Sequence, residues 1–175
     1  PKEEVVYGLL NPDGSVENLY VVNIFDGGNI IDYGTYSKLS NLTDKEALTY
    51  DDNKIFVNTK ADKFYYQGYL VSKDLPWNIA IKYYLDDKEL SPQDLAGKSG
   101  RLRISISVNK NPAINSSFYD NFGLQIGVLL NNKLSSNIEA ENATIAEAAG
   151  SKQISYTVLP GSPFEGTIIA DVKDF

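Results

Sequence analysis

Residues 75–108 read LPWNIAIKYYLDDKELSPQDLAGKSGRLRISISV, and this stretch decides the fold. In its last part, polar residues alternate with four apolar ones, Leu102, Ile104, Ile106 and Val108. Successive side chains of a β-strand point to opposite faces, so this period of two predicts a strand with one apolar face. A second layer must cover that face, and the rest of the chain has to supply it.

The first part of the stretch predicts a second strand followed by a turn. Its alternate residues share one side and include the only tryptophan of the chain: Trp77, Ile79, Ile81, Tyr83 and Leu85. Residues 86–88 have turn composition. Ser91 and Pro92 suit the start of one helical turn, and Gly97 suits its end. We therefore expect strand, turn, one capped helical turn and strand.

The residues before this stretch predict two β-hairpins and an aromatic strand. Residues 4–10 and 16–25 flank the turn-forming segment 11–15, and the glycine pair in residues 26–29 is expected to end the second strand. A second hairpin is expected over residues 46–58. The segment 64–70 is rich in tyrosine and predicts a further strand.

The residues after it continue in the same manner. We expect a polar loop over residues 109–121 and strands over 122–130, 134–142, 153–159 and 166–172. In the first of these strands, Phe122, Leu124, Ile126 and Val128 are expected to share one face. Residues 143–150 are expected to form a helical turn or an irregular crossing.

About ten short strands with little helix predict an all-β protein, an antiparallel β-sandwich. Residues 73–175 supply a strand count close to that of an immunoglobulin-like β-sandwich, although no Cys-Trp-Cys framework is present. Residues 1–72 are expected to form an N-terminal unit of β-hairpins. A single continuous sandwich over the whole chain is the alternative.

Composition excludes several classes of function. The net charge is −7 and the pI is near 4.6, which disfavours binding to nucleic acid or to anionic lipid. The sequence has no cysteine and no histidine, so disulfides, thiolate metal sites and histidine-based catalysis are absent. We therefore expect no catalytic residue, no metal site, no cofactor and no enzymatic activity.

The sequence offers two kinds of candidate site, and each also has a purely structural interpretation. Tyr65, Tyr66 and Tyr69 could form a platform that stacks on sugar rings, but tyrosine is also a common residue of half-buried strands. Residues 51–53 and 86–87 are acidic and could offer oxygens to calcium, but neither segment matches an EF-hand loop. Solvated turns are the simpler interpretation of both acidic segments.

Several strings of the sequence resemble, taken together, the extracytoplasmic N-terminal region of uncharacterised clostridial membrane proteins: VVYGLLNPDGSVENLYVVNIF, IDYGTYSKLSNLTD, FYYQGYL, LPWNIAIKYYLDDKELSPQDLAGKSG and QISYTVLPG. A looser resemblance extends to the YhgE-like phage-infection proteins and the Leu-Gly heptad-repeat proteins of Firmicutes. The resemblance implies an ectodomain that precedes helical and membrane segments. It implies no catalytic residue.

These observations lead to a prediction of function. The chain begins at Pro1 and has no methionine, so we expect it to be part of a longer protein. We expect a non-enzymatic extracellular domain, anchored at a Gram-positive cell surface by segments outside this chain. Its role would be adhesion, envelope organisation or protein interaction, with a protein or envelope component as partner. The alternative is a glycan-binding module that uses the surface tyrosines.

Overall fold

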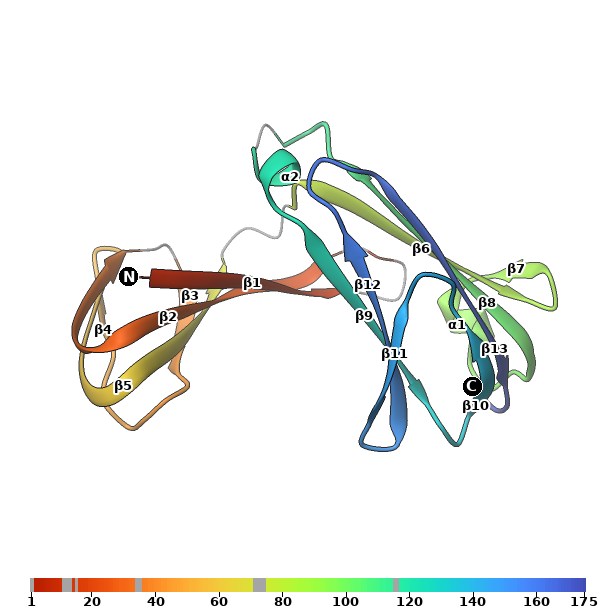
Figure 1. Ribbon diagram of the computed structural model, residues 1–175, viewed down its shortest axis with the longest axis horizontal. Helices are drawn as coiled ribbons and strands as arrows, with labels where there is room; N and C mark the ends of the chain where they lie inside the picture. The colour runs from red at the N-terminus through yellow and green to blue at the C-terminus, as the bar shows by residue number, and fades with distance from the viewer. Residues whose placement is uncertain (1, 11–13, 15, 34–35, 71–74, 115–116) are drawn as a thin grey trace. The chain divides into compact units, whose positions relative to one another are not determined.

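The computed structural model describes residues 2–10, 14, 16–33, 36–70, 75–114 and 117–175 (Figure 1). The chain divides into two compact units. The N-terminal unit holds residues 1–11 and 16–74, and the C-terminal unit holds residues 12–15 and 75–175. The main division of the chain lies between residues 74 and 75.

The C-terminal unit contains two antiparallel sheets. The five-stranded sheet has the order β10 (Ser135–Glu139), β13 (Phe164–Val172), β8 (Gly100–Lys110), β6 (Trp77–Leu85) and β7 (Lys88–Leu90). The three-stranded sheet has the order β11 (Thr144–Ala148), β12 (Ser151–Val158) and β9 (Leu124–Asn131). Two single helical turns, α1 (Pro92–Leu95) and α2 (Phe118–Asn121), complete the described part of the unit.

Side chains from both sheets form one hydrophobic core. The four alternating residues of β8 are at most 4% exposed, which confirms the prediction made from residues 75–108. The three-stranded sheet supplies the opposite layer, and its buried members are Ile126, Leu130, Ile154, Tyr156 and Val158. The packing of these side chains explains why neither sheet needs a further cover on its inner face.

The turn and the helical turn between β6 and β8 form as their residues predict, but Lys88 belongs to the short strand β7, which the sequence did not predict. Asp86 and Asp87 have φ values of 47° and 67°, the positive pair that a tight two-residue hairpin turn requires. The Ser91 hydroxyl accepts a hydrogen bond from the Asp94 amide at 3.3 Å and caps α1. Gly97 then ends the helical turn at φ +76°.

Three predictions for the C-terminal unit are wrong. Residues 144–148 form β11, because pairing with β12 overrides the weak strand propensity of alanine and glutamate. A helical turn, α2, lies inside the expected polar loop, and it buries Tyr119. Phe122 lies outside β9; it is 54% exposed and stacks on Phe118 with ring centroids 4.8 Å apart.

The strand order of the sandwich differs from that of immunoglobulin domains. Leaving out the three-residue β7, the strands β6 and β8–β13 can be lettered A to G in chain order. The sheets then read A-B-G-D and C-F-E. Immunoglobulin constant domains have A-B-E-D and C-F-G, so the fifth and seventh strands have exchanged sheets. The all-β, antiparallel prediction is confirmed, and the immunoglobulin strand order is not found.

The N-terminal unit is a single antiparallel sheet built on two long strands. Its order is β1 (Lys2–Leu10), β2 (Val16–Tyr33), β5 (Lys54–Leu70) and β3 (Tyr36–Asn41), and β4 (Thr49–Asp51) also pairs with β5. The buried residues of its core come from both ends of the long strands: Ile30, Ile55, Val57, Phe64 and Tyr66. This shared core requires the sheet to bend between those ends.

The bend lies at Gly27, where the sequence predicted that the strand would stop. The pairing of β2 with β5 passes from Asp26 opposite Lys63 to Gly28 opposite Thr59, so β5 holds two extra residues there. A Cβ on Gly27 would lie 1.6 Å from the Ala61 carbonyl oxygen, so only glycine allows this approach. The glycine pair therefore bends a continuous strand, and the expected break is wrong.

The predicted hairpin over residues 46–58 is present as β4 and the start of β5. Tyr50 pairs with Ile55, and the two turn residues Asp52 and Asn53 have φ values of 47° and 59°. The two acidic segments that could have offered oxygens to calcium, residues 51–53 and 86–87, therefore form tight turns between strands. Their Asp and Asn residues tolerate the positive φ values that such turns require.

Candidate interaction surfaces

The structure separates Tyr66 from Tyr65, two of the three tyrosines that were predicted to act together. Tyr65 is 38% exposed, whereas Tyr66 is fully buried on the opposite face of β5. The prediction is wrong for Tyr66, because consecutive strand residues face opposite ways. Tyr69 stands four residues after Tyr65 on the same strand, and its side chain lies outside the described part of the chain.

Register gives the N-terminal sheet a row of tyrosines that the sequence alone did not reveal. Tyr7 on β1 pairs with Tyr20 on β2, and Tyr20 pairs with Tyr69 on β5. Four residues further along the same two strands, Ile24 on β2 pairs with Tyr65 on β5. Only the strand pairing brings these positions together, since they are far apart in the sequence.

Tyr66 instead belongs to a buried polar group inside the N-terminal unit. Its hydroxyl donates a hydrogen bond to the Asp32 carboxylate, which is 9% exposed. Beside it, the fully buried Asn23 donates its amide to the Tyr36 hydroxyl at 3.2 Å. Burial, followed by the hydrogen bond to Asp32, raises the pKa of the Tyr66 hydroxyl well above its ordinary value of 10.0.

Replacing Tyr66 by phenylalanine is expected to lower the free energy of unfolding of the N-terminal unit by about 1–3 kcal/mol at pH 7. The change removes a hydrogen bond to a buried carboxylate. Because the folded pKa of Tyr66 is raised, the contribution of its neutral hydroxyl is complete below pH 10.0 and is lost as the pH rises further. Urea unfolding from pH 7 to pH 11 should therefore show the stability gap between wild type and variant closing above pH 10. If the difference in the free energy of unfolding between wild type and variant stayed constant from pH 7 to pH 11, the Tyr66 hydroxyl would not be buried and neutral as described.

The loop after β3 is held to β5 by the carboxylate of Asp44. This carboxylate accepts hydrogen bonds from the Thr59 hydroxyl, the Asn41 amide and the Glu46 backbone. These donors, with Thr59 first, lower the pKa of Asp44 below its ordinary value of 3.8. All its partners are structural, so the site orders the loop and offers no free ligand group.

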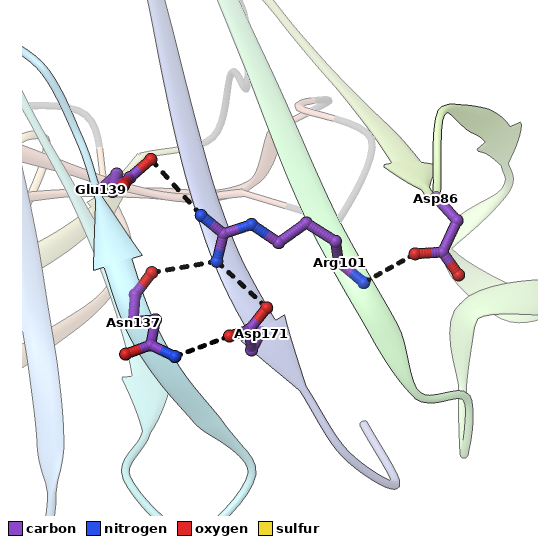
Figure 2. Close-up of polar contacts among 5 residues, drawn as sticks. All are labelled: Asp86, Arg101, Asn137, Glu139 and Asp171. Atoms are coloured by element: carbon purple, nitrogen blue, oxygen red, sulfur yellow. Dashed lines mark hydrogen bonds and ion pairs between the residues drawn. The ribbon is translucent and has the colours of Figure 1, made fainter.

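A second polar network lies on the five-stranded sheet around Arg101 (Figure 2). Its guanidinium reaches from β8 to Asp171 on β13 at 3.1 Å and to Glu139 on β10 at 3.3 Å. It also donates to the backbone carbonyl of Asn137, at 3.1 Å, where the pairing of β10 with β13 is interrupted. The hydrogen bond from Asn137, with a further contribution from Arg101, lowers the pKa of Asp171 below 3.8. Every charged group here pairs with a neighbour, so the network fixes the irregular strand β10.

The outer face of the three-stranded sheet carries no charge. In the register of β9, β12 and β11, the outward positions are Gln125, Gly127, Leu129, Asn131, Ser151, Gln153, Ser155, Thr157, Thr144, Ala146 and Ala148. Charged residues make up 22% of the whole chain, so a face without any is a departure from its general surface. Depletion of charge is a compositional mark of the centres of protein interfaces.

The described residues form neither a metal-binding cluster nor a membrane-spanning helix. Among the described residues, no group of three or more acidic side chains is placed to hold a metal ion. The helices of the described ranges are single turns, and none is long and apolar enough to cross a bilayer.

Comparison with descriptions of protein families and with curated proteins finds no match for this chain. The resemblance to clostridial membrane proteins therefore stays a prediction. What the molecule does has to be argued from the surfaces described above.

Proposed function

We propose that this chain is a non-enzymatic, extracellular domain of a cell-surface membrane protein, and that it acts by binding a protein or an envelope component. The observation that carries the proposal is the uncharged outer face of the three-stranded sheet. The sandwich architecture, which many cell-surface domains share with immunoglobulin domains despite different strand orders, agrees with it.

Composition supports the same proposal. A chain without cysteine or histidine lacks the groups on which most enzymes depend. Among the described residues, the carboxylates with lowered pKa values are Asp44, Glu147 and Asp171, and all three accept hydrogen bonds from neighbouring residues of the fold. The polar groups of both units thus stabilise the fold, and the exposed faces are what a partner can use.

The test is the accessibility of the native protein on intact cells. An antibody raised against the purified chain should label unpermeabilised cells that express the native gene, and added protease should remove the signal. Labelling that appears only after permeabilisation would contradict an extracellular location. A hydrolase activity of the purified chain that disappears on replacing one carboxylate would contradict the non-enzymatic role.

The second candidate function is glycan binding by the N-terminal unit, and the row of tyrosines favours it. Tyr7, Tyr20 and Tyr69 are in register, and Tyr65 occupies an exposed position on the same strand as Tyr69. Aromatic rings offer flat apolar faces with a polar edge, which suits the faces and hydroxyls of sugars. Tyr66 is excluded from this surface by its burial.

Screening the purified chain against a glycan array tests this candidate. Binding should fall at least about tenfold in the variant Tyr65→Ala, since alanine removes the exposed ring. Tyr33→Ala is the matched control, because Tyr33 is 66% exposed on β2 but lies beyond the bend at Gly27. A wild-type chain that binds no glycan, or equal losses in both variants, would remove this candidate.

A further inference from the structure

The edge strands of the described sheets differ in how they are protected against pairing with another chain. Sheet edges expose unpaired amides and carbonyls, and proteins guard them with charge, irregular pairing or short length. Such protection is visible on six edge strands: β1 begins Lys2-Glu3-Glu4, β3 has Lys38 and a register shift, β4 and β7 have three residues each, β10 has a register shift, and β11 has five residues with Glu147.

Strand β9 has none of these protections. It is eight residues long, reads LQIGVLLN and contains no charged residue and no proline. It pairs with β12 in unbroken register over its whole length, so it is regular up to its last residue. Among the described residues, no strand pairs with its other edge. A long, regular and uncharged edge is a template for strand addition.

We propose that β9 pairs with β9 of a second copy of this chain, antiparallel and about a two-fold axis at Gly127. The apolar inward residues are arranged symmetrically about Gly127: Leu124, Ile126, Val128 and Leu130. In this register, Leu124 faces the partner's Leu130 and Ile126 faces the partner's Val128, so all four find apolar neighbours. The two three-stranded sheets then form one continuous six-stranded sheet, and the contact is isologous.

The second copy is favoured over another partner by this symmetry and by the lack of charge. Two copies of an acidic chain repel one another in general, and an uncharged edge adds no local repulsion to their approach. In the same register, the outward Gln125 faces the partner's Leu129, which is 64% exposed in one copy. The inference concerns the edge of the sheet and does not depend on the proposed cell-surface role.

Sedimentation equilibrium of the purified chain tests the proposal. A single strand pair buries less than the interface of about 1,600 Å² that is typical of stable complexes, so a monomer–dimer equilibrium in the micromolar range is expected. The double variant Gln125→Glu/Leu129→Glu sets like charges opposite each other twice and should weaken dimerisation at least about tenfold. Gln125→Lys/Leu129→Glu sets opposite charges against each other at the same two places and should restore it.

The control is Gln153→Glu/Thr157→Glu, which adds the same two negative charges to the same face on the inner strand β12. It should leave the dimer within about threefold of wild type, since the charges do not lie opposite each other. A wild-type chain that is monomeric up to about 1 mM would overturn the proposal. So would a dimer that tolerates both glutamates at positions 125 and 129, or one that the lysine–glutamate pair fails to restore.

Discussion

Replacing Gly27 by alanine is expected to prevent the N-terminal unit from folding while the C-terminal unit stays folded. The new methyl group would lie 1.6 Å from the Ala61 carbonyl oxygen. Both atoms belong to the backbone or are fixed to it, so no rotamer change relieves the overlap. The paired strands β2 and β5 would have to separate at the bend, which we expect to cost more than about 4 kcal/mol.

Gly28→Ala is the matched control for this prediction. Gly28 has φ +110°, but a Cβ there would meet no atom within 4 Å, so backbone strain of about 1–3 kcal/mol is the only cost. Hydrogen exchange should show the amides of β2 and β5 unprotected in the first variant and protected in the second. Fluorescence of Trp77, the only tryptophan, reports the C-terminal unit and should be unchanged in both. If the Gly27 variant kept the protection of β2, the close approach at Ala61 would be refuted.

The behaviour of Gly27 shows where the sequence is a good guide and where it is not. A glycine pair after a strand predicts a break, because glycine tolerates the backbone angles of turns. The structure uses the same two residues for a bend, since the pairing of β2 continues on its far side with a segment of β5 some thirty residues away. Long-range pairing decided the outcome, and local composition contains no signal for it.

The C-terminal unit was more predictable because its strands show clean alternation. Leu102, Ile106 and Val108 are fully buried as their period of two requires. By contrast, β11 has a sequence that favours helix and becomes a strand only because β12 offers its edge. The exchange of the fifth and seventh strands relative to immunoglobulin domains could not be foreseen either, since strand order depends on which distant strands pair.

For the two candidate surfaces, too, the sequence shows some features and only the structure shows the others. The tyrosine cluster was visible in the sequence, but strand parity buries Tyr66 and register brings in Tyr7 and Tyr20. Strand β9 contains no charged residue, but its position at the edge of a sheet follows only from the topology. Which residues share a surface is therefore decided by strand pairing, even where the sequence already shows the residues themselves.

Replacing Ile106 by alanine is expected to lower the free energy of unfolding of the C-terminal unit by about 2–5 kcal/mol, through lost burial and the cavity that remains. Ile106 is fully buried in the middle of β8, and it pairs with Ile81 on β6 and with Gly166 on β13. The position opposite on β13 is a glycine, and the rings of Phe164 and Tyr156 lie directly over it. Urea unfolding followed by Trp77 fluorescence measures the loss.

The control lies one residue away on the same strand. Ser105 faces outward, so Ser105→Ala should change stability by no more than about 0.5 kcal/mol. The contrast between the two variants tests the alternation on which the assignment of the fold depends. Equal, small losses would mean that β8 does not present Ile106 to a core between two sheets, and the three-stranded sheet would then have no reason to pack against it.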